Sequence, residues 1–106
     1  MGFTANLAQV GRTAVITLTG ELDTLTAPAF LTEIERAAGT DLDRLVLDMS
    51  RLTYLSSAGL RGLVFARQKM ADGVRIVLVN ANDSIQRTIV LVGFQYSVEF
   101  ADRLPA

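Results

Sequence analysis

Apolar and polar residues alternate weakly at the start of the chain, and alternation is the spacing of a strand with one buried face. This pattern predicts a first strand over Phe3–Val10, and the β-branched residues within Ala14–Thr19 predict a second one. The short turn between them, Gly11-Arg12, predicts an antiparallel hairpin. We expect the second strand to end at Gly20.

Apolar residues at helical spacing follow this hairpin. The residues that form the apolar stripe are Phe30, Ile34, Ala37 and Ala38. Thr26 is the expected N-cap, and Pro28 is tolerated in the first turn because no intrahelical hydrogen bond is lost there. Gly39 is a typical C-terminal stop, so the pattern predicts a first helix between Thr26 and Gly39.

Two nearly continuous apolar runs lie further along the chain, Leu45–Asp48 and Val74–Val79, the second interrupted by Arg75. Strands that are covered on both faces show such runs, so both are expected to be central strands of a sheet. An irregular turn is expected after the first run. It leads into a second helix that starts at a pair of serines and ends at Asp72-Gly73.

A third helix is expected after the second run, with Asn82 or Asp83 as its N-cap and Gly93 at its end. Its apolar residues are Ile85, Ile89, Val90 and Val92. Val98–Phe100 is expected to form a short last strand, followed by a tail over residues 101–106. Strands that alternate with helices predict an α/β fold with a mostly parallel sheet, and the length suits one domain over residues 1–106.

The loops after the second and third predicted strands, Gly20–Asp23 and Tyr54–Ser57, carry the candidate chemistry. Sites of α/β folds lie beyond the carboxyl ends of parallel strands, so we expect the two loops to be neighbours in space. Ser56 and Ser57 would then stand at a helix N-terminus. Serine caps such ends, and the same position favours an anion such as a phosphate on a serine oxygen. The residues alone leave both roles open.

Composition excludes several classes of function. The 106 residues carry a net charge of −1, show no basic run and include neither His nor Cys. Nucleic-acid binding through a basic patch is therefore disfavoured, and neither disulfides nor a histidine base are available. No apolar run approaches the roughly 18 residues of a membrane span, and the first residues do not form a secretory signal. We expect a cytoplasmic protein without direct membrane insertion.

Catalysis by the serine pair is not expected. Lys69 lies about three turns further along the predicted helix, which is too far to activate Ser57. The chain also has no glycine-rich phosphate-binding loop with a lysine. We therefore expect a protein that is acted upon rather than an enzyme, without catalytic residues, cofactor or metal.

Two motifs resemble signatures of a known family. The segments Leu45–Ser50 and Leu55–Leu60 together resemble the central motif of STAS domains, in particular of the small stand-alone anti-sigma factor antagonists. Thr19–Asp23, followed by Thr26-Ala27, resembles a second signature of that family. The order and spacing of both motifs fit, and the resemblance covers nearly the whole chain. It implies a STAS-like α/β fold: a small mixed, mostly parallel sheet with an N-terminal antiparallel hairpin and helices mainly on one face.

The resemblance also implies partner switching. The unphosphorylated protein would bind a serine kinase that doubles as an anti-sigma factor and would thereby free the sigma factor. Ser57 matches the family's phosphorylated serine, and its phosphorylation would end this binding until a serine phosphatase resets the cycle. Ser56 replaces the family's Asp and is the alternative acceptor, while Ala58 replaces the second Ser or Thr.

Three acidic residues are weighed beside the serines. The resemblance places Asp23 close to the acceptor serine, where it would orient the hydroxyl or the kinase's nucleotide, with Glu21 in the same loop. From the residues alone, Asp23 is equally compatible with an exposed turn residue. Asp48, at a strand end, is expected to accept hydrogen bonds from nearby backbone N–H groups.

A helical wheel that starts at Ser57 places Arg61 and Phe65 on the side of Ser57, together with Gln68 and Asp72. The opposite face, expected to be the core face, collects Leu60, Leu63, Val64, Met70 and Ala71. An exposed Phe65 is either an ordinary surface residue or an anchor for the kinase. In the second case Ser57, Arg61 and Phe65 form one binding stripe, and Arg61 meets an acidic group of the kinase.

Two other functions are compatible with a STAS domain. One is a regulatory subunit of a lipid or anion transport complex, and the other is a sensor for a small ligand. The paired serines and the length of the chain favour the antagonist over the transport subunit.

Overall fold

A tight hairpin opens the fold, as the alternation predicts. In the computed structural model, which describes residues 2–104, β1 (Thr4–Val10) pairs with β2 (Thr13–Leu22) in a continuous antiparallel register. Gly11 in the turn has a φ of 59°, a left-handed conformation that glycine adopts without steric cost. A two-residue turn of this kind matches the natural twist of the two strands.

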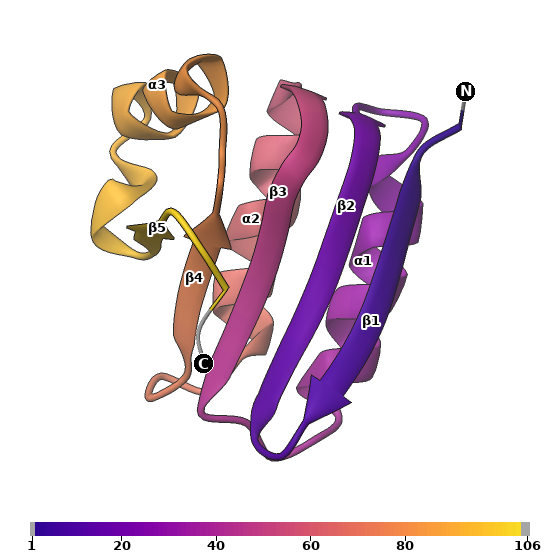
Figure 1. Cartoon of the computed structure of the whole chain (residues 1–106), viewed down its shortest axis with the longest axis vertical. Helices are drawn as coiled ribbons and strands as arrows, with labels where there is room; N and C mark the ends of the chain where they lie inside the picture. The colour runs from indigo at the N-terminus through magenta and orange to yellow at the C-terminus, as the bar shows by residue number, and fades with distance from the viewer. Residues whose placement is uncertain (1, 105–106) are drawn as a thin grey trace.

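Five strands form one sheet in the order β1-β2-β3-β4-β5 (Figure 1). The other strands are β3 (Arg44–Leu55), β4 (Arg75–Val79) and β5 (Glu99–Ala101), and each pairs in parallel with its neighbour. Since β1 and β2 are antiparallel, the sheet is mixed and mostly parallel, which confirms the predicted class of fold.

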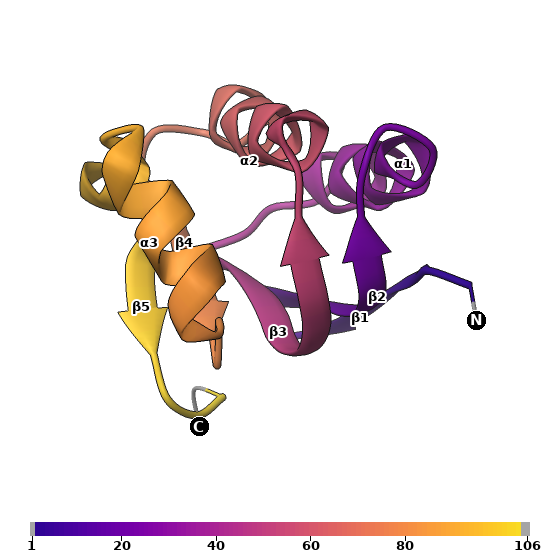
Figure 2. The ribbon, with the colours of Figure 1, turned by 90° about the horizontal axis from the view of Figure 1, so that it is seen from above.

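Three α-helices and a short 3₁₀-helix connect the strands: α1 (Ala27–Ala38), α2 (Ser57–Lys69), α3 (Asp83–Leu91) and η1 (Phe94–Tyr96). Figure 2 shows α1 and α2 on the same face of the sheet, while α3 lies at the edge formed by β4 and β5. Within residues 2–104, no helix is long and apolar enough to cross a membrane.

The main core lies between the sheet and the helices α1 and α2, and α3 contributes Ile85 and Ile89 to it. Its largest fully buried side chains include Ile16, Leu18, Phe30, Ile34, Leu45, Leu47, Leu63 and Ile89. A second, smaller cluster of Val46, Val77 and Val79 is buried on the opposite face. The central strands therefore bury side chains on both faces, which explains their continuous apolar runs.

The second and third strands are both longer than predicted. β2 runs through Gly20 to Leu22, and β3 continues past Asp48 to Leu55. Their parallel pairing persists through two register shifts. Such bulges disturb the alternation by which a strand is recognised in a sequence, so the polar part of β3 resembled a turn.

The predicted boundaries and core face of α2 also need correction. The helix ends at Lys69, before Asp72-Gly73, and Val64 is 42% exposed rather than buried. Ala71 is exposed as well. The buried helical residues are Ala58, Gly59, Gly62, Leu63 and Ala66. The helical wheel assigned the core face from the large apolar side chains, whereas α2 packs against its neighbours mainly through small residues.

The last elements lie close to their predicted positions. Asn82 is the N-cap of α3, since its side-chain oxygen accepts a hydrogen bond from the N–H of Ile85 at 2.9 Å. The helix ends at Leu91, shortly before Gly93. The last strand is shifted by one residue, to Glu99–Ala101.

Candidate functional site

The carboxyl ends of β2 and β3 lie side by side. Leu22 stands opposite Leu55, and the N–H of Ser56 donates a hydrogen bond to the C=O of Leu22 at 2.9 Å. The segments around Asp23 and Ser57 are thus neighbours in space, as the sequence predicts. Both α1 and α2 start from this end of the sheet (Figure 1).

Ser56 caps α2. Its backbone is extended, and its hydroxyl oxygen accepts a hydrogen bond from the N–H of Gly59 at 3.4 Å. Its C=O accepts a further bond from the N–H of Leu60 at 3.0 Å, and the residue is half-buried. Of the two serines, Ser56 therefore has the capping role.

Ser57 is the first residue of α2 and is exposed. Its hydroxyl forms none of the side-chain hydrogen bonds found among residues 2–104, in contrast to that of Ser56. The first turn of α2 contains no acidic residue. Because a helix N-terminus has free N–H groups and a positive dipole end, a negative group on the oxygen of Ser57 would be favourably placed.

Two glycines allow α2 to pack closely. A Cβ atom on Gly59 would lie 2.5 Å from Cδ1 of Leu55, 3.0 Å from Cγ of Leu22 and 3.1 Å from the carbonyl oxygen of Leu22. A Cβ atom on Gly62 would lie 2.9 Å from the ring of Phe30 in α1. Close packing within the chain thus accounts for both glycines, and Gly59 sets the distance between the serine pair and the strand ends.

Asp23 holds the turn that leads into α1, whose N-cap position is occupied by Thr26 as predicted, although Thr26 makes no capping bond of its own. One carboxylate oxygen of Asp23 accepts hydrogen bonds from the N–H groups of Leu25 and Thr26, at 3.0 and 3.1 Å. In return, the N–H of Asp23 donates to the hydroxyl oxygen of Thr26 at 2.8 Å. This reciprocal arrangement resembles a capping box, and it leaves Asp23 half-buried rather than exposed.

Asp48 has the structural role that was expected for it. Its carboxylate accepts a hydrogen bond from the N–H of Ser50 at 3.1 Å, within the bulged part of β3. The bond stabilises the local backbone, so Asp48 belongs to the strand rather than to the site.

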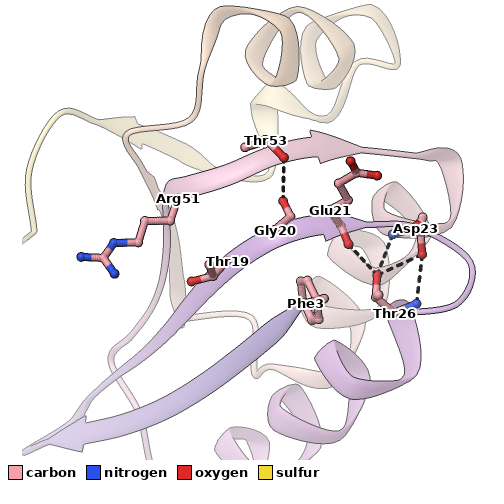
Figure 3. Close-up of a pocket in the computed structure, with 8 residues that line it drawn as sticks. All are labelled: Phe3, Thr19, Gly20, Glu21, Asp23, Thr26, Arg51 and Thr53. Carbon is pink, nitrogen blue, oxygen red and sulfur yellow. Dashed lines mark hydrogen bonds between the residues drawn. The ribbon is translucent and has the colours of Figure 1, made fainter. Parts of the chain in front are cut away.

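A pocket of about 450 Å³ lies beside the capped start of α1 (Figure 3). It is lined by Phe3, Thr19, Gly20, Glu21, Asp23, Thr26, Arg51 and Thr53. The Thr53 hydroxyl donates to the C=O of Gly20 at 3.1 Å, and the bonds between Asp23 and Thr26 form one wall. Glu21 is exposed here, whereas the carboxylate of Asp23 accepts hydrogen bonds in the turn before α1.

A second groove, of about 540 Å³, lies between α1 and α2. It is lined by Thr24, Ala27, Pro28, Leu31, Ala58, Arg61, Gly62, Val64, Phe65 and Gln68. Arg61 is exposed and forms none of the ion pairs found among residues 2–104. Phe65 is half-buried and packs against the main core, with Nζ of Lys69 5.5 Å from the centre of its ring. Phe65 is therefore less exposed than the helical wheel predicted, although it lines the same groove as Arg61.

Comparison with known protein families identifies the fold. The sequence model of the STAS domain matches residues 4–105. The chain belongs to the STAS domain family. The resemblance seen in the two sequence motifs is thereby confirmed.

Several relatives of this STAS domain are named anti-sigma factor antagonists. RsfB of Mycobacterium tuberculosis, an anti-sigma-F factor antagonist, is 30% identical over 90 residues, which cover 85% of this chain and 74% of that protein. The crystal structure of an anti-sigma factor antagonist from Mycobacterium paratuberculosis has a TM-score of 0.87 at 25% identity, over 97% of this chain and 88% of that chain.

The Bacillus protein SpoIIAA in its phosphorylated form shares the fold, with a TM-score of 0.74 at 22% identity over 94% of this chain and 93% of that chain.

The structure gathers the predicted site residues of this STAS domain on two adjoining surfaces. Glu21, Asp23 and the serine pair lie at the strand ends, and Arg61 and Phe65 lie in the groove between α1 and α2. The lining also includes residues that the sequence patterns did not assign to a site, among them Arg51 and Thr53 of β3 and Pro28 and Leu31 of α1. Only the pairing of β3 with β2 and the packing of α1 on α2 bring these residues to the site.

Proposed function

We propose that this STAS domain is an anti-sigma factor antagonist that acts by partner switching. Its unphosphorylated form binds an anti-sigma factor that is also a serine kinase, and this binding frees the sigma factor. The kinase transfers the γ-phosphoryl group of ATP to the oxygen of Ser57, and ADP and the hydroxyl proton leave. A serine phosphatase then restores the binding form. The names of the relatives support the role, and we expect a protein with this role to act in the cytoplasm.

The observation that carries the choice of Ser57 is the difference between the two serines. Ser57 is exposed and its hydroxyl is free of hydrogen bonds within residues 2–104, whereas the oxygen of Ser56 caps α2. A kinase must align a hydroxyl oxygen with the phosphoryl group that it transfers. Ser57 offers such an oxygen without loss of the helix cap.

A single phosphate on Ser57 is sufficient for a switch. At the N-terminus of α2 it would be tolerated by the fold, and the helix dipole stabilises it by about 0.3–1 kcal/mol. Buried in an interface without a cation, the same charge would cost about 3–5 kcal/mol. At about 1.4 kcal/mol per factor of ten, binding weakens by roughly a hundredfold to a few thousandfold. Modification would therefore separate the complex without unfolding the domain.

The proposed contact surface extends from Ser57 along α2. Arg61 and Phe65 follow at intervals of four residues and line the groove between α1 and α2. Arg61, which forms no ion pair within residues 2–104, supplies a cation for an acidic group of the kinase, and the exposed part of Phe65 supplies an apolar contact. Aromatic residues and Arg are enriched at energetic hot spots of interfaces. Glu21 extends the surface toward the strand ends.

The assignment is tested by incubating the protein with its partner kinase and ATP, followed by intact-mass and fragment spectra. Ser56→Ala and Ser57→Ala form a matched pair, since each removes one hydroxyl of the same motif. We expect wild type and Ser56→Ala to gain one phosphate on Ser57, and Ser57→Ala to gain none. A phosphate on Ser56, or on a residue outside the pair, would show that the acceptor is wrong.

The partner is tested by capture on immobilised Ser57→Ala protein, which cannot be modified at the proposed acceptor. We expect an ATP-binding serine kinase to be retained and to be released by sigma factor. Retention of a transporter ATPase or permease instead would support the transport subunit and contradict the antagonist.

A further inference from the structure

β1 forms an unprotected edge of the sheet. It stands at the end of the strand order, and no described strand pairs with its outer side (Figure 1). Its seven residues, Thr4–Val10, pair with β2 without a register shift. Residues 2–11 include no charged residue and no proline. Proteins usually block strand pairing at an edge with charges, prolines, bulges or very short strands, and β1 has none of these.

The opposite edge of the sheet is protected. β5 contains three residues, Glu99–Ala101. The carboxylate of Glu99 accepts hydrogen bonds from the guanidinium group of Arg75 at 2.8 and 2.6 Å, so a charged pair lies at this edge. The two edges therefore differ in the features that decide whether another strand can add to them.

The register of the hairpin shows which backbone groups of β1 are free. The two-residue turn makes Val10 and Thr13 a hydrogen-bonded pair, and such pairs alternate along an antiparallel ladder. The even-numbered residues of β1 thus bond to β2. The N–H and C=O groups of Ala5, Leu7 and Gln9 point away from the sheet and are available to another strand.

We propose that β1 of a second copy of this chain pairs with this edge in antiparallel fashion, about a two-fold axis at Leu7. In this register Leu7 faces Leu7, and Ala5 of each copy faces Gln9 of the other. All of these residues present free backbone groups to the edge. The two sheets join into one continuous sheet across the dimer. Because the interface is two-fold symmetric, it closes after two copies and does not grow into a fibre.

The side chains favour a second copy as the occupant. No like charges meet, since β1 is uncharged, and Arg12 at its end is paired with Asp41 and Asp43. Val10, which is 78% exposed, faces Thr4 of the other copy, and β-branched residues form favourable cross-strand pairs. Ala5 and Leu7 are half-buried and pack against the core. The strand of the second copy would bury more of their surface at the edge.

Sedimentation velocity over a range of concentrations tests the proposal with two matched double variants. Asn6 and Ala8 are exposed side chains of β1 and would face each other across the axis. Asn6→Lys with Ala8→Lys brings like charges together twice, and we expect a dimer about tenfold weaker or more. Asn6→Glu with Ala8→Lys brings opposite charges together at the same positions, and we expect a dimer at least as tight as wild type.

A third variant, Gln9→Pro, removes an N–H group that points away from β2, and we expect a monomer that still folds, as checked by circular dichroism. A wild-type protein that stays monomeric at millimolar concentration would overturn the proposal and leave the edge to a strand of another protein. Two double variants that dimerise equally would overturn the register. Neither result depends on phosphorylation of Ser57, so the failure of this inference is distinct from that of the proposed function.

Discussion

The close approach of α2 to the strand ends predicts that Gly59→Ala destabilises the protein. Alanine is the better helix former by about 1 kcal/mol, so propensity alone predicts a gain. The new Cβ, however, would lie 3.1 Å from the carbonyl oxygen of Leu22 and 2.5 Å from a methyl group of Leu55. Both leucines are buried, at 0% and 6% exposure, so neither side chain has free space to move into.

The expected magnitude follows from these opposing effects. Inserting an atom into a well-packed core costs about 1–3 kcal/mol, and contact with a backbone oxygen puts Gly59→Ala at the upper end. After the gain in helix propensity, we expect a net loss of about 1–2 kcal/mol in the free energy of unfolding. For a domain of this size, the melting temperature then falls by roughly 4–8 °C for each kcal/mol.

Two other glycines provide graded controls. A Cβ on Gly73 meets nothing within 4 Å, so Gly73→Ala should leave stability unchanged or raise it slightly. A Cβ on Gly62 meets the ring of Phe30, which can shift slightly although it is fully buried, so an intermediate loss is expected. Urea unfolding and thermal melts of the three variants measure the series. If Gly59→Ala were as stable as Gly73→Ala, the packing argument would be refuted.

Three further predictions concern the switch, the groove and pH. Ser57→Asp should bind the kinase roughly a hundredfold more weakly, while its melting temperature stays within a few degrees, as titration calorimetry and a thermal melt would show; unfolding or unchanged binding would contradict the switch. Phe65→Ala should weaken kinase binding and also lower the melting temperature because Phe65 is half-buried, whereas Arg61→Ala should weaken kinase binding at an unchanged melting temperature; unchanged kinase binding in both variants would exclude the stripe. Arg75 lowers the pKa of Glu99, so their pair stabilises the protein above the ordinary pKa of a glutamate and loses this contribution as the pH falls through the lowered value. Near neutral pH, Glu99→Gln should therefore be less stable than wild type, by a small amount because the pair is exposed. In acid the two proteins should be equally stable, as unfolding at several pH values would show.

Local patterns of the sequence were sufficient for most of the architecture. Alternation and a turn with glycine predicted the N-terminal hairpin, and continuous apolar runs predicted the central strands, since these signals depend on neighbours within a few residues. The serine pair marked the start of α2 for the same reason, because capping is a local interaction. The two motifs also predicted the family, which the match over residues 4–105 confirms.

The tertiary structure decided what depends on residues far apart in the chain. Pairing with β2 carried β3 through its bulges to Leu55, where the sequence indicated a turn. Because α2 approaches Leu22 and Phe30 closely, Gly59 and Gly62 lie on its buried side. Val64 is therefore exposed, although the helical wheel placed it on the core face with the other large apolar residues. A sequence pattern records which side chains are apolar, but packing also depends on which are small enough to let two backbones meet.

The same distinction applies to the candidate site. The local pattern placed Ser56 and Ser57 together at a helix start, and only the family resemblance favoured Ser57 as the acceptor, because both are serines in the same local setting. The geometry distinguishes them: Ser56 is held by the N–H of Gly59 and by the C=O of Leu22, whereas Ser57 is exposed and its hydroxyl forms no hydrogen bond within residues 2–104. Which of the two adjacent serines caps the helix and which is exposed depends on how the strand enters the helix, and that path is set by the contact between β2 and β3.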